Sequence, residues 1–125
     1  MLAGKDTHYE SQLRKECYKD RLKYHGIELK ESQVEECNMA RSCHDEARKL
    51  LDRNLDAEAI FCVNDYSAFG LYDVLNERKI AIGKDIYVFG CDNAEFSSEL
   101  NPSLSSIDLK HVGQGLPEFT LVNIK

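Results

Sequence analysis

A chain of 125 residues, 42% of them hydrophobic and 30% charged, is long enough for one domain with a core and too short for two. Its apolar stretches fall well short of the roughly 18 residues that a membrane-spanning helix needs. The net charge of −6, with no basic run longer than a pair, excludes the basic patch that neutralises nucleic-acid phosphates. We therefore expect a domain that contacts neither a membrane nor DNA directly.

The first half of the chain shows two helical patterns. Apolar and semi-apolar side chains recur at helical spacing from Tyr9 to His25, and Gly26 then supplies a stop. A second helix is predicted over Met39–Arg53, with Ser42 or Asn38 as its N-cap. The face that this second helix turns inward consists of Met39, Cys43, Ala47, Leu50 and Leu51.

Short apolar runs alternate with the helices. Ala59–Val63 and Ile86–Cys91 resemble central parallel strands buried on both faces, and weaker strand patterns cover Gln33–Cys37 and Leu104–Leu109. A third helix, Tyr66–Arg78, places one group of apolar residues on a single side: Ala68, Leu71, Tyr72 and Leu75. This alternation predicts an α/β fold, a three-layer Rossmann-like lobe with a mainly parallel sheet and right-handed crossovers.

An amide–carboxylate pair follows each of the two strongest strands. Asn64-Asp65 comes after the first and Asp92-Asn93 after the second. Ligands of open α/β sheets bind at the carboxyl ends of the strands, so both pairs should line one crevice. Carboxylates and amides suit a polyhydroxylated ligand, because a hydroxyl both donates and accepts. Two other roles remain open: Asp65 as a helix cap, and Asp92-Asn93 as an Asx-turn.

The cysteines and histidines predict neither a disulfide framework nor a metal site. Five cysteines form an odd set, no secretory signal precedes them, and a reduced, cytoplasmic compartment is the simpler interpretation. Cys37, Cys43 and His44 resemble a zinc cluster, but no second pair completes it. We expect no metal and no cofactor.

Catalysis is the competing class of function. Asp92 imitates the phosphoacceptor of a receiver domain, but the first segment ends in Lys5-Asp6 and lacks the acidic pair that would hold magnesium. The nucleophile-elbow, P-loop and dinucleotide-binding motifs are missing too. We therefore expect no enzyme, with an α/β phosphotransfer enzyme using Asp92 as the remote alternative.

Four motifs in order resemble the LacI/GalR-type transcription regulators. Residues 59–70, AIFCVNDYSAFG, are similar to their AIFCANDxxAxG stretch, and residues 80–93, IAIGKDIYVFGCDN, to IxVPxDIxVxGFDD. Residues 101–107, NPSLSSI, resemble NPPLTTI. Upstream, Arg14 to Tyr18 with Leu22 and Gly26-Ile27 resembles RxxGYxxAL…GI.

The resemblance implies a fold, a site and an assembly. The fold is the two-lobed periplasmic-binding-protein type, and residues 1–114 correspond to its C-terminal lobe. Arg14, Asn64 and Asp92 would face a small-molecule effector such as a sugar, while Asp65 would be structural. A homodimer would form in the full-length protein through a face that includes Phe69, Phe96 and Leu100.

The chain also departs from the family pattern. Cys17 replaces a glycine and Cys91 an aromatic residue beside the predicted crevice, and Gly115-Leu116-Pro117 interrupts the long helix expected there. Residues 115–125 form a tail that the sequence does not assign to the lobe. Within this tail, Phe119–Ile124 resembles a strand or a truncated hinge region. All four motifs belong to the C-terminal lobe, so we expect the sequence to contain neither the first lobe nor the helix-turn-helix.

The function implied is an effector-sensing lobe that controls DNA binding allosterically through a separate helix-turn-helix. The alternative within the same fold is the sugar-binding lobe of a periplasmic or extracellular receptor. Because one wall of the crevice is missing, we expect the lobe alone to bind sugars weakly.

Overall fold

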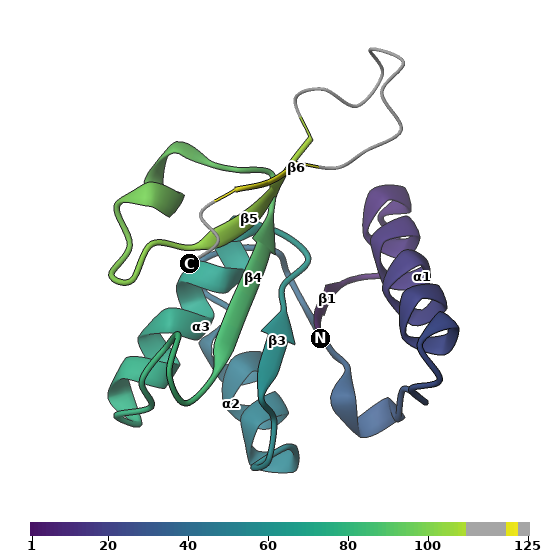
Figure 1. The fold of residues 1–125 in the computed structure, drawn as a ribbon, viewed down its shortest axis with the longest axis horizontal. Coiled ribbons are helices and arrows are strands. Elements are labelled where there is room, and N and C mark those ends of the chain that lie inside the picture. Colours follow the sequence, from purple (N-terminus) through teal and green to yellow (C-terminus); the bar gives the residue numbers. More distant parts are fainter. Residues whose placement is uncertain (110–119, 123–125) are drawn as a thin grey trace.

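The computed structural model describes residues 1–109 and 120–122, which form alternating strands and helices (Figure 1). In chain order these are β1 Leu2–Gly4, α1 Tyr9–Tyr24, η1 Glu31–Gln33, β2 Glu35–Cys37, α2 His44–Arg53, β3 Ala59–Phe61, α3 Asp65–Glu77, β4 Tyr87–Cys91, η2 Glu95–Ser98, β5 Ser105–Asp108 and β6 Thr120–Val122.

Parallel pairing dominates the sheet. β1 pairs with β2, and β3 with β4 and β4 with β5, all in parallel. A parallel bridge from Leu2 to Cys62 joins the two groups, so the strand order is β2-β1-β3-β4-β5-β6. The exception is β6, which runs antiparallel to β5 at the edge. These pairings confirm the predicted α/β fold with a mainly parallel sheet.

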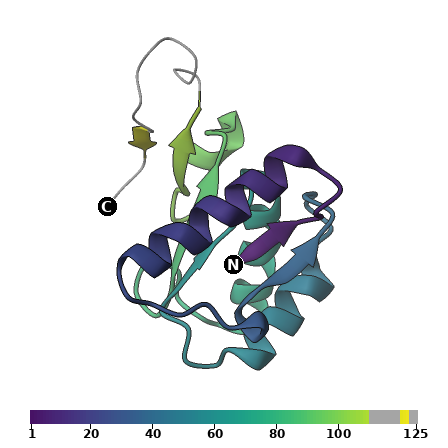
Figure 2. The same cartoon turned by 90° about the vertical axis from the view of Figure 1, so that its right-hand side faces the viewer.

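Helices cover both faces of the sheet. Figure 2 shows α1 across one face, with α2 and α3 on the other. The main core lies on the α2/α3 side, where two of the inward-facing leucines of α3, Leu71 and Leu75, have no exposed surface. The predicted inner face of α3 is confirmed, because Ala68 is also fully buried and Tyr72 is only 3% exposed.

The first helix buries polar side chains, whereas the apolar residues of its pattern are half-buried, as Tyr18 and Leu22 are, or exposed. Leu13 is 41% exposed and Cys17 is also exposed, whereas Ser11 and Lys15 are buried. The Lys15 ammonium pairs with the Asp6 carboxylate and, at 3.2 Å, with that of Glu36. Helical spacing therefore predicted the helix correctly but not the side chains that it turns inward.

The predicted start of the second helix is wrong. α2 begins at His44, and its N-cap is Cys43 without a side-chain capping bond to the described residues. Met39 has φ 58°, a left-handed conformation that no helix contains. The Asn38 side chain accepts a hydrogen bond from the Ala40 amide at 3.2 Å, a local turn that competes with helix formation.

β1 and β6 are the first and the last strand of the described residues. β1 was missing from the predicted order of elements, because three apolar or small residues at the chain start give no periodicity to detect. In the tail, Thr120–Val122 forms β6 within the predicted stretch Phe119–Ile124. The boundary between residues 114 and 115, and the interruption at Gly115–Pro117, lie outside the described residues.

Truncation of a core leucine tests this packing. We expect Leu71→Ala to lower the free energy of unfolding by about 2–5 kcal/mol, because it removes buried methyl groups and leaves a cavity. Leu55 is 87% exposed, so Leu55→Ala should change stability by no more than about 0.5 kcal/mol. Urea denaturation of both variants measures the difference, and equal losses would contradict the assigned core.

Candidate functional site

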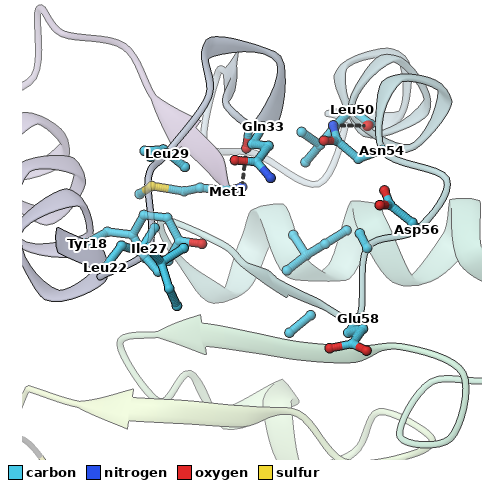
Figure 3. Close-up of a pocket in the computed structure, with 13 residues that line it drawn as sticks. Met1, Tyr18, Leu22, Ile27, Leu29, Gln33, Leu50, Asn54, Asp56 and Glu58 are labelled. Atoms are coloured by element: carbon cyan, nitrogen blue, oxygen red, sulfur yellow. Dashed lines mark hydrogen bonds between the residues drawn. The ribbon is translucent and has the colours of Figure 1, made fainter. Parts of the chain in front are cut away.

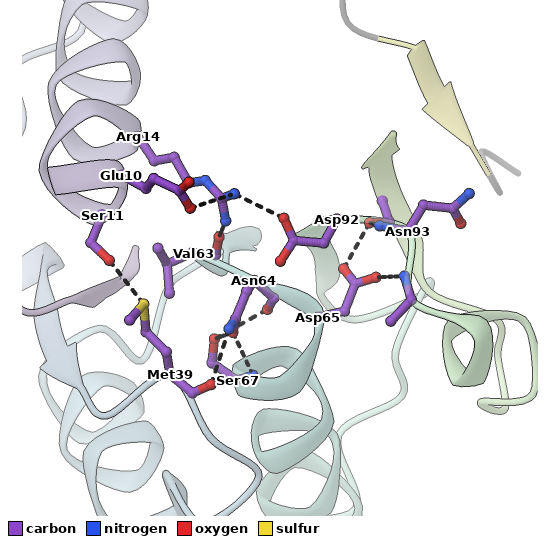
Figure 4. Close-up of polar contacts among 12 residues, drawn as sticks. Glu10, Ser11, Arg14, Met39, Val63, Asn64, Asp65, Ser67, Asp92 and Asn93 are labelled. Carbon is purple, nitrogen blue, oxygen red and sulfur yellow. Dashed lines mark hydrogen bonds and ion pairs between the residues drawn. The ribbon is translucent and has the colours of Figure 1, made fainter. Parts of the chain in front are cut away.

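Arg14 joins α1 to the ends of two neighbouring strands (Figure 4). One guanidinium nitrogen, Nη1, donates to the Val63 carbonyl after β3 at 2.7 Å. The other, Nη2, donates to Asp92 Oδ1 after β4 at 2.8 Å and lies 3.8 Å from Glu10 Oε2. The Arg14 side chain is 19% exposed and that of Asp92 is 43% exposed, so the pair is accessible from one side. The parallel pairing of β3 and β4 thus brings residues 78 positions apart into direct contact.

The Asp92 carboxylate is held in an unfavourable setting. Asp92 and Asn93 adopt φ of 107° and 51°, a backbone conformation that residues other than glycine rarely take. Partial burial raises the pKa of the Asp92 carboxyl above its ordinary value, although the Arg14 guanidinium acts in the opposite direction. Strained backbone and a desolvated carboxylate of this kind concentrate at functional sites.

Asn64 caps α3, the role that the sequence had suggested for Asp65. Its Oδ1 accepts from the Ser67 amide at 2.9 Å, and its Nδ2 donates to the Met39 carbonyl at 3.0 Å. The side-chain amide carries two N–H donors, and one of them bonds to no other residue in the part of the chain that the structure describes. The predicted capping role of Asp65 is wrong, because Asp65 is already the first residue of the helix.

Asp65 is fully buried and faces away from the crevice, toward the segment that follows β4. Its carboxylate accepts from the Ala94 amide at 2.8 Å and from the hydroxyls of Ser97 and Ser106 at 2.6 and 2.7 Å. Asp65 therefore stabilises the segment that follows Asp92, on the side away from Arg14.

Met39 and Ser11 also border the site, and the sequence did not single them out for it. The Ser11 hydroxyl donates to Met39 Sδ at 2.8 Å, and the Met39 carbonyl accepts from Asn64. The sequence had placed Met39 at the start of a helix, on its inward face. The signal that identifies the turn is Asn38, a residue that favours local turns over helix.

Two cavities flank α1. A groove of about 540 Å³ starts beside Arg14, and its apolar lining includes Tyr18, Phe61 and both cysteines that depart from the family pattern, Cys17 and Cys91. A second cavity of about 510 Å³ lies at the amino ends of the strands, around Met1 (Figure 3). It is therefore at the edge of the sheet opposite to the Arg14–Asp92 pair.

An aromatic cluster lies on the side of α3 beside η2. The Phe96 ring is 5.1 Å from that of Tyr66 and 5.7 Å from that of Phe69, measured between centroids. The exposed Arg41 guanidinium lies over all three rings, 4.5 Å from the Phe69 centroid. Leu100 is half-buried and packs against the core.

Residues 1–115 match the family of periplasmic binding protein-like domains. The chain belongs to this family. Similar proteins include the HTH-type transcriptional repressor PurR of Vibrio atlanticus, 35% identical over 92 residues. The ribose operon repressor of Escherichia coli K12 is 31% identical over 98 residues. These alignments cover 72% and 78% of this chain.

Solved structures of LacI-type regulators share the periplasmic binding protein-like fold. The Escherichia coli repressor ascG superimposes with a TM-score of 0.79 at 29% identity, over 86% of this chain and 39% of that protein. A LacI family regulator from Enterococcus faecium with bound ribose gives 0.75 at 27% identity, over 86% and 40%. The resemblance to the effector-binding lobe of LacI/GalR-type regulators is confirmed.

This periplasmic binding protein-like chain spans under a third of the curated relatives, 27% of PurR and 30% of the ribose operon repressor. Within the described residues, no helix combines the length and the apolar character needed to cross a membrane.

The raised pKa of the Asp92 carboxyl makes the stability of the fold depend on pH. The Asp92 carboxyl holds its proton more tightly in the folded chain than in the unfolded chain, because folding raises the pKa of this carboxyl above 3.8. Stability therefore falls as pH rises through the folded pKa, and Asp92→Asn removes this loss. We expect wild type to lose stability relative to Asp92→Asn between pH 3.8 and neutrality, measured by urea denaturation.

The exposed Asp20 on the same helix as Arg14 provides the control, since Asp20→Asn also removes one negative charge. A stability difference between wild type and Asp92→Asn that stays flat or grows in favour of wild type as pH rises would contradict this account.

Proposed function

We propose that this chain is the effector-sensing lobe of a LacI-type transcription regulator. The observation that carries the proposal is the Arg14–Asp92 pair at the carboxyl edge of β3 and β4, with Asn64 beside it. In this account the effector binds between this edge and a second lobe. Closure of the two lobes then shifts the population between DNA-competent and DNA-incompetent forms, and a separate helix-turn-helix contacts the operator.

The chemistry of the edge favours a sugar. The Arg14 guanidinium supplies N–H donors in a fixed geometry, and the Asp92 carboxylate accepts hydrogen bonds from hydroxyl groups. The Asn64 amide offers the N–H that bonds to no other described residue. Related proteins carry names that agree with this class, namely the ribose operon repressor and regulators solved with cellobiose or ribose. A hydroxyl missing from the wrong sugar leaves a polar group unpaired, which costs about 1–3 kcal/mol and gives selectivity.

Calorimetric titration with ribose and cellobiose tests the site. We expect weak binding by these 125 residues alone, because a ligand normally buries 70–90% of its surface and they supply one wall of the proposed crevice. Arg14→Gln should abolish this binding, since it removes the charge that pairs with Asp92. Lys19→Gln on the exposed side of α1 is the control and should bind as wild type does.

Submicromolar affinity for this chain alone would contradict the claim that it supplies only one wall of the binding crevice. Binding that survives Arg14→Gln would contradict the assignment of Arg14 to the site. Failure of every sugar in the panel at the limit of solubility would contradict the proposed effector class.

A receptor lobe for a transporter or membrane sensor is the second candidate, because the matching family is described as periplasmic binding protein-like. The similarity to named repressors favours the regulator, which acts in the cytoplasm and is not an enzyme. Five free cysteines agree with a reducing compartment. The coding sequence upstream of Met1 separates the candidates by encoding either a helix-turn-helix or a signal or membrane segment.

We further propose that the aromatic cluster of Tyr66, Phe69 and Phe96 with Arg41 is the core of a homodimer face. Aromatic rings and arginine are the residue types that carry most interface binding energy. Leu100 belongs to the same predicted face; it follows η2 by two residues and is half-buried.

Replacing one ring by a charge tests the dimer face. Phe69→Glu should weaken dimerisation at least tenfold in sedimentation equilibrium, because it buries a carboxylate among the rings of the interface. Tyr87→Glu is the control, since Tyr87 is 51% exposed at the opposite end of the sheet. Equal dimerisation by both variants would contradict the assignment.

A further inference from the structure

Asp65 holds together two segments that belong to different parts of the proposed function. The Asp65 side chain is fully buried, yet no ion pair between described residues includes it. Its carboxylate accepts hydrogen bonds from the Ala94 amide, the Ser97 hydroxyl and the Ser106 hydroxyl, and it lies in the first turn of α3, where the helix dipole favours a negative charge. A buried carboxylate satisfied only by neutral donors is costly to retain, so its partners are held firmly in place.

One group of these bonds leads to the ligand edge. The Ser106 hydroxyl donates to Asp65 Oδ1 at 2.7 Å and accepts from the Asn93 amide at 2.9 Å. Asn93 and its neighbour Asp92 form the strained turn that presents the carboxylate to Arg14. Through Ser106, Asp65 therefore stabilises the Asp92–Asn93 turn.

The other group leads to the aromatic cluster. The Ser97 hydroxyl, in η2, donates to Asp65 Oδ2 at 2.6 Å, and the Ala94 amide donates to the same oxygen at 2.8 Å. Phe96, next to Ser97 in η2, contacts both rings of α3. The position of η2, and with it Phe96, thus depends on the same carboxylate.

Strand β4 leaves the carboxylate no room to move. A Cβ added to Gly90 would lie 2.1 Å from Asp65 Oδ1 and 3.0 Å from a methyl carbon of Leu104, so only glycine fits there. A displacement of η2 therefore cannot be absorbed by a shift of Asp65 toward the sheet, because interiors are close-packed.

We infer that Asp65 is a positioning residue that couples the Asp92–Asn93 turn to η2, so that effector contact at Asp92 is transmitted to the dimer face at Phe96. The inference rests on the proposed function for its two end points. The coupling itself is a property of Asp65 and its three donors, and it can be measured without an effector.

Hydrogen exchange of single amides, followed by NMR on Ser97→Ala, tests the coupling directly. We expect exchange of the Asn93 amide to accelerate about tenfold, the size expected for loss of one hydrogen bond. The Asn93 amide bonds to Ser106, which shares the Asp65 carboxylate with Ser97, so the hydrogen-bonded route from η2 to Asn93 runs through Asp65, beside the short backbone connection through Ala94. Amides of α2, such as those of Leu50 and Leu51, should exchange at wild-type rates.

Ser98→Ala is the matched control, because the Ser98 hydroxyl lies in the same short helix but donates to the Glu95 carbonyl. It should leave Asn93 exchange unchanged. Acceleration throughout the chain in Ser97→Ala would show general destabilisation, and unchanged Asn93 exchange would show that η2 moves independently; either result overturns the coupling.

Sedimentation with ribose as the probe then connects the coupling to function. Wild type should change its dimer dissociation constant at least fivefold on saturation with ribose, a typical size for allosteric coupling. Ser97→Ala should bind ribose but lose this dependence. If Asn93 exchange responds as expected while no sugar binds, the coupling stands and the proposed effector function fails; if ribose binds and Ser97→Ala keeps the dependence, the coupling fails.

Discussion

Arg14 connects α1, which lies across one face of the sheet, to the ends of β3 and β4. The two acceptors of its guanidinium, the Val63 carbonyl and the Asp92 carboxylate, follow neighbouring strands whose ends share one edge because the strands are parallel. Parallel strands with helical crossovers place their carboxyl ends at one edge, and polar groups after each strand gather there. The site, the cap of α3 and the turn after β4 all follow from this one arrangement.

The same edge contains the features that disfavour folding. Asp92 and Asn93 have positive φ, and partial burial raises the pKa of the Asp92 carboxyl in spite of the adjacent guanidinium. Each is unfavourable for an isolated domain, and each presents a defined acceptor to a ligand. Asp65 differs from Asp92, because its side chain is fully buried and accepts hydrogen bonds from three donors, the Ala94 amide and the Ser97 and Ser106 hydroxyls.

Periodicity predicted the larger elements, and the strand-end rule predicted which side chains would meet. Leu71 and Leu75 lie in the core because α3 has one continuous apolar face. The roles within the pair Asn64-Asp65 could not be assigned from sequence, since both residue types cap helices and only the loop after β4 supplies the donors that bury Asp65.

Tertiary contacts also overrode local patterns at two other places. Lys15 is buried because Asp6 and Glu36 approach it from separate segments, a juxtaposition that helical spacing does not contain. Met39 leaves the helix pattern because Asn38 organises a turn and the Met39 carbonyl serves Asn64.

The most direct test of the central claim is to map amide chemical-shift changes while ribose or cellobiose is titrated into the 15N-labelled chain. The account predicts that the changes concentrate at Asn64, Asp92 and Asn93, with a matching change at the Arg14 side chain. Changes centred instead on the cavity around Met1, at the opposite edge of the sheet, would contradict it.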